Sequence, residues 1–450
     1  MAIEEYDLFV IGTGTAGKRV ATACAEAGWH VAIADRREYG GTCSNRGCDP
    51  KKVLVGITEV MELSKNLMGK GLNSVPEVNW EDLMKFKRTF TDAIPAATER
   101  DFKEIGVKMY HQSPSFLDNN TLSVEGKTVR AKKIVIATGM HPVELKIPGR
   151  EHALLSDDFL ELPQLPKSMI FIGAGYVGME FAHIAARCGV KVTIVDTEDR
   201  ILTNFDEKLA NYLQENSEQL GIEFVLGTRV NAIEKLRKNF RVSGKRGEET
   251  IEVKAEMVFN TAGRVPSIEE LDLEKGNVAF EKDGITVNEY LQSPTNPDVF
   301  ACGDVSASGT LPLTPLSSQE ARVVKYNLLK GNVMKLDVPP TPSVVFTQPQ
   351  LASVGLNEKE AREKGYDFHV REENVPHWYN SKRFNQNCYA YKTLIDKKTG
   401  LVLGAHLLSA DAAETINMFV MAMCGKLDCS TLKGMIFTYP SWASDIKAMV

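Results

Sequence analysis

Residues 40–52 read GGTCSNRGCDPKK and place two cysteines, Cys43 and Cys48, five positions apart. A disulfide needs its Cα atoms within about 7 Å, which the opening turns of a helix provide at this spacing. The helix that we expect to begin here also favours a thiolate, because its free N–H groups and dipole stabilise negative charge. The spacing alone leaves three interpretations open: a redox-active pair, a structural disulfide, or two unrelated buried thiols.

A dinucleotide-binding pattern precedes this stretch. Residues 6–35 predict a strand, a turn with Gly12, Gly14 and Gly17, a helix, and a second strand that ends at Asp35. In such a unit the glycines let the backbone approach a pyrophosphate at the helix N-terminus, and the acid accepts hydrogen bonds from ribose hydroxyls. The pattern is informative because the strand, the helix and the acid all lie at suitable distances.

The same pattern returns over residues 169–196, where Gly173, Gly175 and Gly178 follow a strand and Asp196 ends the next one. Two such units predict two dinucleotides in one chain, which a flavin-mediated hydride relay requires. The alternative is a duplicated fold with a single working site.

Asp196 also bears on the choice of nicotinamide cofactor. A carboxylate at this position accepts a free 2′-hydroxyl and repels a 2′-phosphate, so NADH is favoured over NADPH. Arg200 follows four residues later and is a possible partner for a phosphate.

Composition and charge set outer limits. A chain of 450 residues is expected to form two to four domains, and 43% apolar with 25% charged residues is typical of a globular protein. A net charge of -6 without a basic run predicts no nucleic-acid binding, and no apolar run predicts a membrane span. The first strand begins at residue 6 with no basic or cleavage region before it, so we expect no signal peptide. Eight cysteines at scattered spacings favour a reducing cytoplasm.

Apolar periodicity predicts further elements. Two apolar stripes predict packing helices over 53–68 and 80–102. A proline-rich stretch at 339–342 marks a domain boundary. Beyond it the pattern predicts three strands and then two helices, over 343–346, 387–395, 401–408, 412–424 and 429–437.

The segment GGTCxNxGCxPKK is similar to the active-site segment of class I pyridine nucleotide–disulfide oxidoreductases, the group of glutathione reductase, dihydrolipoamide dehydrogenase and mercuric reductase. The resemblance covers almost the whole chain. It implies an α/β fold with two Rossmann-like domains, for FAD and NAD(P), and an α+β C-terminal domain that forms a homodimer. The implied segments are 1–145 and 265–336 for FAD, 146–264 for NAD(P), and 337–450 for dimerisation.

The resemblance also implies roles for individual residues. Cys48 faces the flavin and Cys43 exchanges with the substrate, while Lys52 pairs with Glu180 and stabilises reduced flavin. Tyr176 covers the nicotinamide site until NAD(P)H arrives. The residues expected to bind the two cofactors, besides Tyr176, are Gly12, Gly14, Gly17, Asp35, Gly41, Thr42, Thr138, Gly139, Gly173, Gly175, Gly178, Asp196, Gly263, Arg264, Gly303, Asp304 (on the ribityl chain) and Thr314.

The chain departs from the family at its C-terminal motif. Disulfide reductases of this group end in His-Pro-Thr-x-x-Glu, whereas residues 438–445 read TYPSWASD. Tyr439 replaces the histidine, and Ser444 replaces the glutamate, with Asp445 next. Phenols ionise near pH 10 and are poor bases at neutral pH, whereas a general base is worth about 10²–10⁴-fold. We therefore expect Tyr439 of the partner chain to supply a hydrogen bond or a proton.

This departure leaves several functions open. In the leading one, NAD(P)H reduces a small disulfide, persulfide or related sulfur substrate whose leaving thiol is acidic. In the others the chain reduces a metal ion, as mercuric reductases do, reduces a quinone or oxygen, or senses redox state without efficient turnover.

A few nearby residues are secondary candidates. His377 and Tyr379 are alternatives to the missing base, and Arg46 and Asp49 are expected to tune substrate choice or the thiolate pKa. The late cysteines at positions 424 and 429 are expected to be core thiols rather than metal ligands.

Overall fold

The computed structural model describes residues 3–450 and divides into two compact units. Unit 1 holds the described residues up to 51, with 85–143 and 264–338, and unit 2 holds 52–84, 144–263 and 339–450. Both units mix helices with sheets, which confirms the expected α/β class. The expected four-segment division of the chain stays a prediction. Within the described part of the chain, no helix is both long and apolar enough to cross a bilayer.

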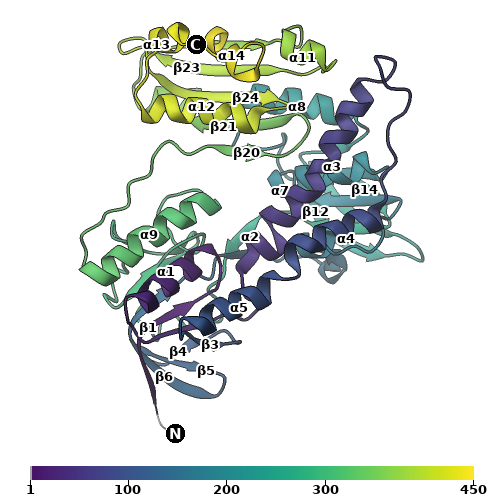
Figure 1. Ribbon diagram of the computed structural model, residues 1–450. Coiled ribbons are helices and arrows are strands. Elements are labelled where there is room, and N and C mark those ends of the chain that lie inside the picture. Colours follow the sequence, from purple (N-terminus) through teal and green to yellow (C-terminus); the bar gives the residue numbers. More distant parts are fainter. Residues whose placement is uncertain (1–2) are drawn as a thin grey trace. The chain divides into compact units, whose positions relative to one another are not determined.

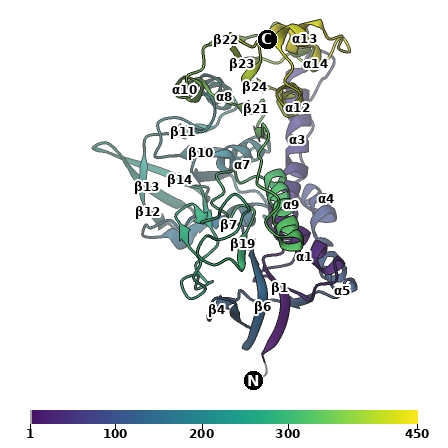
Figure 2. The same ribbon diagram turned by 90° about the vertical axis from the view of Figure 1, so that its left-hand side faces the viewer.

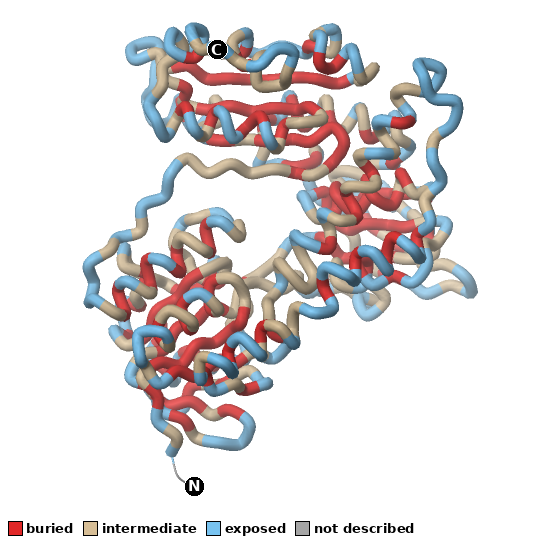
Figure 3. The backbone as a smooth tube through the Cα atoms, in the orientation of Figure 1, coloured by how far each residue is buried: buried red, intermediate tan, exposed pale blue. Residues whose placement is uncertain are grey.

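Unit 1 is built on a seven-stranded sheet with the path β3-β2-β1-β6-β5-β4, to which β19 adds beside β6. The strands are β1 (Glu4–Ile11), β2 (Val31–Ala34), β3 (Lys108–Tyr110), β4 (Ser115–Phe116), β5 (Thr121–Val124), β6 (Lys127–Ile136) and β19 (Val299–Ala301). The central strands pair in parallel and are apolar on both faces, as expected where both faces are covered. Their buried segments form the red centre of unit 1 in Figure 3.

Helices α1 (Thr15–Glu26) and α9 (Thr314–Lys330) pack against one another over this sheet. They lie side by side in both ribbon views (Figures 1 and 2). The redox segment forms α2 (Gly41–Arg46) and then α3 (Cys48–Asn66). A Cβ on Gly47 would lie 2.8 Å from the Thr42 carbonyl oxygen, so a glycine there lets one helix end and the next begin within a single residue.

Unit 2 contains a second parallel sheet, ordered β11-β10-β9-β15-β8. Its strands are β8 (Ala153–Leu154), β9 (Ser168–Ile172), β10 (Lys191–Val195), β11 (Glu223–Val225) and β15 (Met257–Asn260). Helix α7 (Tyr176–Arg187) follows β9, as in the first nucleotide-binding pattern, and α8 (Glu207–Gln219) follows β10. A three-stranded antiparallel sheet, β12 (Arg229–Lys235), β13 (Phe240–Arg246) and β14 (Glu249–Ala255), precedes β15.

The C-terminal part of unit 2 is an antiparallel sheet covered by helices. The strand order is β20-β21-β24-β23-β22, with bounds Ser343–Val345, Gln350–Gly355, Val402–Ser409, Ala390–Asp396 and Phe368–Asn374. Helices α12 (Ala412–Cys424), α13 (Cys429–Gly434) and α14 (Trp442–Met449) complete this layer, and α11 (Tyr379–Arg383) lies between β22 and β23 in the sequence. Strands β21 and β22 lie outside the three strands expected here.

The helix expected over 80–102 is two helices, α4 (Trp80–Thr91) and α5 (Ile94–Glu104). Pro95 occupies the first turn of α5, where a backbone N–H has no partner within the helix, so its absence costs no hydrogen bond. In an uninterrupted helix the same position would need an N–H to donate.

Candidate active site

The first glycine-rich turn is shaped for close backbone contact. Gly12 has φ 107°, and a Cβ there would lie 2.3 Å from the Ala137 carbonyl oxygen. A Cβ on Gly17 would lie 1.9 Å from the Gly12 carbonyl oxygen. The cap residue of α1, Gly14, places no side chain over the first N–H groups of the helix. These groups can therefore bind a phosphate.

Asp35 joins this turn to the end of β2. Its Oδ2 accepts hydrogen bonds from Thr13 N at 2.8 Å and Thr13 Oγ1 at 2.6 Å, and its Oδ1 accepts one from Arg37 N at 3.0 Å. The carboxylate therefore holds the glycine-rich turn. A carboxylate oxygen can accept more than one hydrogen bond, so Asp35 keeps capacity for a ribose hydroxyl.

The neighbouring residues fit a large dinucleotide. Gly41 approaches Gly14 so closely that a Cβ on it would lie 2.3 Å from Gly14 Cα, and Thr42 beside it is exposed. Thr138 Oγ1 is buried without a hydrogen-bond partner among the described residues. Gly139, with φ 66°, faces open space. An orphaned buried hydroxyl beside open space is expected where a polar cofactor supplies the missing partner.

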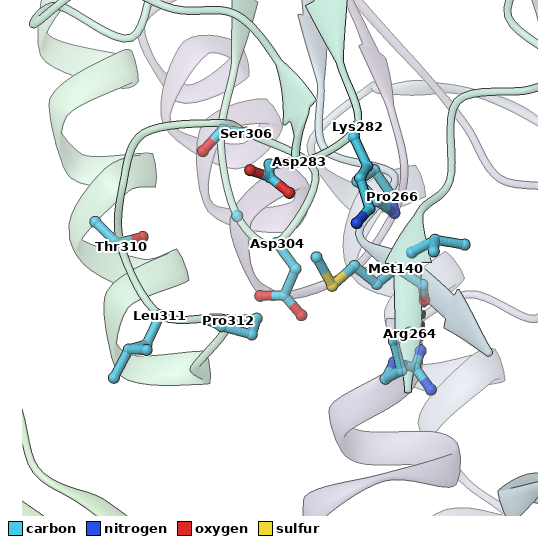
Figure 4. A pocket seen from close by; sticks show the side chains of 12 residues that line it. Met140, Arg264, Pro266, Lys282, Asp283, Asp304, Ser306, Thr310, Leu311 and Pro312 are labelled. Atoms are coloured by element: carbon cyan, nitrogen blue, oxygen red, sulfur yellow. Dashed lines mark hydrogen bonds between the residues drawn. The ribbon is translucent and has the colours of Figure 1, made fainter. Parts of the chain in front are cut away.

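A cavity of about 210 Å³ adjoins this turn within unit 1. Its lining includes Arg264, Lys282, Asp283, Asp304 and Thr310. In Figure 4 the Asp304 carboxylate points into the space between the Thr310 loop and the Arg264 strand. Burial raises the pKa of Asp304, and the Arg264 charge is among the influences that oppose this. The cavity thus presents a carboxylate and cations to a ligand with hydroxyl and phosphate groups.

The glycines next to these two charged residues adopt conformations that favour glycine. Gly303 has φ 77° and Gly263 has φ 116°, and Gly263 faces open space. Arg264 donates a short hydrogen bond to the Met140 carbonyl oxygen, drawn as a dashed line in Figure 4. The arginine is therefore fixed at the cavity wall.

The structure places Cys43 and Cys48, both free thiols, against the same hydroxyl group, that of Thr314. Thr314, the first residue of α9, contacts both: its Oγ1 donates to Cys43 Sγ at 3.3 Å and lies 3.8 Å from Cys48 Sγ. The two cysteines are therefore a pair rather than unrelated buried thiols.

The two thiols differ in acidity. The hydrogen bond from Cys43 is the largest influence on Cys48 and, against the opposing effect of burial, lowers the pKa of Cys48 to about 6. The same hydrogen bond and burial raise the pKa of Cys43. Of the nearby charges, Lys51 lowers the pKa of Cys48 and Asp49 raises it. At neutral pH the pair thus holds one thiolate, on Cys48, and one thiol, on Cys43.

Arg46 and Asp49 occupy different surroundings. Arg46 Nη2 pairs with Glu38 Oε2 at 2.5 Å and fastens α2 to the preceding loop. Asn45, beside it, donates to the Tyr39 carbonyl oxygen at 3.0 Å. Asp49 is exposed in the first turn of α3 and acts on both thiols through its charge. Asp49 therefore influences the thiol pKa values, as expected, whereas Arg46 holds α2 in place.

The second glycine-rich turn repeats the first. A Cβ on Gly173 would lie 2.3 Å from the Thr261 carbonyl oxygen, and one on Gly178 would lie 2.0 Å from the Gly173 carbonyl oxygen. Gly175, the cap residue of α7, faces open space. The N-terminus of α7 is therefore open to a second dinucleotide.

The acid and the arginine near this turn have distinct partners. Asp196 accepts a short hydrogen bond from Ala174 N, and one from Glu198 N at 2.9 Å. Arg200 Nη2 donates to the Thr203 carbonyl oxygen at 2.6 Å, and its Nη1 reaches two further carbonyl oxygens of the same loop. The guanidinium that we considered for a 2′-phosphate is thus used to hold its own loop.

Lys52 has a different partner from the one expected. Its Nζ pairs with Glu59 Oε1 at 3.0 Å, two turns along α3, and lies 4.4 Å from the centroid of the Phe346 ring. Glu180 is buried in α7, and its Oε1 accepts a hydrogen bond from Phe346 N at 2.8 Å. The expected Lys52–Glu180 pair is therefore corrected to Lys52–Glu59. Tyr176 is half exposed at the start of α7.

At the end of the chain, Tyr439 is 77% exposed, and its ring lies 6.4 Å from that of Tyr379. Ser444 caps α14 by a reciprocal pair of hydrogen bonds with Ser441. Asp445 accepts hydrogen bonds from Asn380 Nδ2 and Tyr389 OH. Neither residue thus replaces the family glutamate as a partner of position 439.

Burial shows which of three cysteines outside the pair are core thiols. Cys302 is fully buried, as expected for a packing residue, and burial raises its pKa. Cys429 is half-buried, but Cys424 is exposed and is not the core thiol that we expected. Within the described residues, no group of three or more His, Cys, Asp or Glu side chains could hold a metal ion.

Sequence reasoning named Thr314 as a cofactor-binding residue but missed its contact with the thiols, and it missed Glu320 altogether. The Thr314 hydroxyl reaches the thiols from a segment 266 residues beyond Cys48, which no local pattern reveals. Glu320 is buried in α9 and accepts hydrogen bonds from four donors of the loop that carries Asp304. The signal for Glu320 was an acidic residue on a largely apolar helix face.

Comparison with known proteins agrees with this site and with the order of its motifs along the chain. Residues 6–321 match the model of the pyridine nucleotide-disulphide oxidoreductases, and residues 341–450 match the dimerisation domain of that family. The glutathione reductase of Nostoc sp. is 32% identical over 462 residues, covering 99% of each chain. The mercuric reductase of Staphylococcus aureus is 28% identical and covers 98% of this chain and 81% of that enzyme.

Among solved structures, the Cu(II) complex of the HOCl-induced flavoprotein disulfide reductase RclA from Escherichia coli is 28% identical, with a TM-score of 0.87 and 99% of both chains covered. The family is FAD-dependent and uses NAD(P)H. Along the sequence, the paired-thiol site lies between two nucleotide-binding patterns, and the dimerisation domain follows them. The chain therefore belongs to the pyridine nucleotide–disulfide oxidoreductases.

Proposed function

We propose that this chain passes electrons from NADH through FAD to the Cys43–Cys48 pair and on to a small disulfide, persulfide or related sulfur compound. The observation that carries the proposal is the pair itself, one acidic and one weakly acidic thiol that both lie against the Thr314 hydroxyl. Such a pair separates the two roles of a dithiol, because one sulfur rests as thiolate and the other is available to a substrate.

The protein residues act as follows. Bound FAD supplies the two-electron link between nicotinamide and disulfide. Gly12, Gly14 and the N-terminus of α1 would hold its pyrophosphate, and Asp304 would accept hydrogen bonds from its hydroxyls. Cys48 rests as the thiolate, while Cys43 attacks a substrate disulfide and releases the first thiol. Cys48 then attacks the sulfur of Cys43 and releases the second thiol, which restores the disulfide.

The nicotinamide cofactor is NADH in this proposal. Asp196 disfavours a 2′-phosphate at the second site, and Arg200 is engaged by carbonyl oxygens of its own loop. Tyr176, at the mouth of this site, moves aside for the nicotinamide, and Glu180 supports α7 beneath it. We expect kcat/KM for NADH to exceed that for NADPH, and Asp196→Ser to narrow the difference. Equal values for the unchanged protein would contradict this choice.

The working form is a homodimer in the cytoplasm. The family's dimerisation domain and eight free cysteines support these two points. In the dimer Tyr439 donates a hydrogen bond or proton to the sulfur that leaves at the other chain's pair, which suits a substrate whose thiol is already acidic.

An anaerobic mixing experiment tests the central proposal. NADH should bleach the flavin absorbance and produce a long-wavelength band from a thiolate beside oxidised flavin. The band should vanish in Cys48→Ser, which keeps the fold and removes the thiolate. If the protein is instead a redox sensor with a disconnected disulfide, NADH would bleach the flavin of the unchanged protein without producing the long-wavelength band.

A metal ion is the second candidate substrate. The relatives include mercuric reductases, and one of the solved structures similar to this chain is a Cu(II) complex of RclA. The exposed Cys48 and half-buried Cys43 would be the ligands, since soft metals prefer thiolates. NADH oxidation should be compared with an aromatic disulfide, Cu(II), Hg(II), a quinone and oxygen as acceptors. The sulfur substrate would be favoured if turnover depends on Cys43 when the disulfide is the acceptor but not when any of the other acceptors is used.

A further inference from the structure

The hydroxyl of Thr314 lies against both reacting sulfur atoms, at 3.3 Å from Cys43 Sγ and 3.8 Å from Cys48 Sγ. Thr314 begins α9, a helix of 17 residues that packs against α1. A hydroxyl at the first position of a packed helix is held in place more firmly than one on a loop. The contact is therefore a fixed feature of the dithiol site.

The chain has to move the Cys43 proton without the imidazole that relatives use. Tyr439 is a phenol, a poor base at neutral pH. The other sulfur of the pair is acidic, because Cys43 lowers the pKa of Cys48. A base is thus present inside the pair, provided that the negative charge is stabilised when it passes to Cys43.

We propose that the Thr314 hydroxyl is a catalytic group that stabilises negative charge on either sulfur and so lets Cys48 serve as the base for Cys43. This inference rests on the proposed disulfide function. Its support is geometric, because a single hydroxyl lies 3.3 Å from the Cys43 sulfur and 3.8 Å from the Cys48 sulfur and can turn its proton to either one. The hydroxyl also lowers the pKa of both thiols, as a donor to either thiolate should.

The step balances as follows. The Cys43 proton passes to the Cys48 thiolate, and the Thr314 hydroxyl donates to the new Cys43 thiolate. This thiolate attacks a disulfide RSSR, forming the mixed disulfide and releasing RS⁻, which takes the proton from Cys48 and leaves as RSH. The Cys48 thiolate then attacks the Cys43 sulfur, closes the protein disulfide and releases RS⁻. The reduced pair brings one proton and one negative charge, and these leave as RSH and RS⁻. Two electrons pass from the dithiol to RSSR.

Two charged groups near the pair influence the same equilibrium. Asp49 raises the pKa of both thiols, and Lys51 lowers that of Cys48. Both charged residues are on α3 and are unchanged by a substitution on α9. A difference in thiol titration between variants at position 314 therefore reports the effect of the hydroxyl.

The test compares Thr314→Val, which keeps the shape and removes the hydroxyl, with Thr314→Ser, which keeps the hydroxyl. Ser318→Ala is the matched control, because its hydroxyl is one turn along α9 and bonds only the Thr314 carbonyl oxygen among its described contacts. The dithiothreitol-reduced proteins are alkylated with iodoacetamide from pH 5 to 9, and modification of each cysteine is followed by peptide mass. Thr314→Ala provides a second hydroxyl-free variant should the valine protein not fold.

We expect the Cys48 midpoint to rise by about one pH unit in Thr314→Val, and Cys43 alkylation at pH 7 to slow about tenfold. Thr314→Ser and Ser318→Ala should match the unchanged protein within twofold. Midpoints and rates that are equal across all four proteins would overturn the inference.

A second readout separates this inference from the proposed function. In Thr314→Val, the turnover of 5,5′-dithiobis(2-nitrobenzoate) should fall about tenfold relative to the rate of flavin bleaching by NADH in the same protein, and Thr314→Ser should restore the ratio. Equal loss of both would contradict a role confined to the thiols. Absence of the long-wavelength band in the unchanged protein would instead refute the proposed function, whatever the alkylation rates show.

Discussion

Cys48 is acidic because hydrogen bonding outweighs burial. The hydrogen bond from Cys43 lowers its pKa most, burial opposes it, and the charges of Lys51 and Asp49 add smaller effects of opposite sign. Both charged residues are on the first turn of α3 and act on the thiolate through their charge.

These opposite effects give a matched pair of substitutions. Asp49→Asn should lower the Cys48 pKa by about half a unit, and Lys51→Met should raise it by a similar amount, since a removed charge shifts the thiolate equilibrium by its Coulombic share. The pH dependence of iodoacetamide alkylation measures both. A shift of the same sign in the two variants would refute the charge effect and indicate a structural change.

The thiolate also links stability to pH in the reduced protein. The folded pKa of Cys48 is about 6, below the value of about 8.5 for an unfolded cysteine. Between these values the unfolded chain binds a proton that the folded chain lacks, so the free energy of unfolding rises with pH. The contribution is complete above about pH 8.5 and is lost as pH falls through 6.

Thermal unfolding under reducing conditions should therefore show a larger rise in Tm between pH 6 and 8.5 for the unchanged protein than for Cys48→Ser. Cys43, whose pKa is raised, titrates above this window. Parallel curves for the two proteins would show that Cys48 is not acidic in the folded state.

Among the elements, the loop from Gly303 to Thr310 depends on one buried side chain of α9. The Glu320 carboxylate accepts hydrogen bonds from Gly303 N, Ser306 Oγ, Ser308 Oγ and Thr310 Oγ1, at 2.6–2.9 Å. Burial raises its pKa. This loop lines the cavity together with Asp304 (Figure 4). Glu320 therefore fixes a wall of the proposed FAD site.

Replacing Glu320 should therefore weaken both stability and cofactor retention. Glu320→Ala leaves four donors without an acceptor and should cost about 3 kcal/mol. Glu320→Gln keeps one acceptor oxygen but places an amide donor against hydroxyls, so it should recover only part of the loss. Chemical denaturation and the FAD content after dialysis measure the two effects, with exposed Glu289→Gln as control. Full FAD retention in Glu320→Ala would argue against the loop's role.

Elements with a local cause were predictable from the sequence. The glycine-rich turns followed from strand, glycine and acid spacing, and α12 begins and ends where the apolar period places it. The break between α4 and α5 was visible only as Pro95, which a helix also tolerates in its first turn. Strand β22 was missed because most of its residues are exposed and polar, so no apolar alternation runs along it.

The site was predictable where chemistry is local and not where it comes from distant segments. Cys43 and Cys48 are five residues apart, so their contact follows from the turn between α2 and α3. Thr314 and Glu320 reach the site through α9, and Lys52 turns to Glu59 on its own helix instead of to Glu180. Such partner choices depend on packing, which no spacing rule contains.

At the scale of the whole molecule, the chain keeps both nucleotide-binding patterns and the dithiol but changes the C-terminal residues. In the proposed homodimer this end of the chain completes the partner's site. Each substituted residue makes other contacts in the structure, since Ser444 caps α14 and Asp445 accepts from Asn380 and Tyr389. The change is therefore built into α14 rather than confined to one position.

This bears directly on restoring a general base at position 439. Tyr439→His alone should raise glutathione disulfide reduction only modestly, about threefold, because no carboxylate orients the ring. Tyr439→His with Ser444→Glu supplies the missing acid and should approach a gain of about 10²-fold, at the lower end of general-base catalysis. Tyr439→Phe should slow turnover of the natural acceptor if the phenol donates to the leaving sulfur. Steady-state kinetics at pH 7 measure all three, and unchanged rates in Tyr439→Phe would remove the phenol from the mechanism while leaving the dithiol intact.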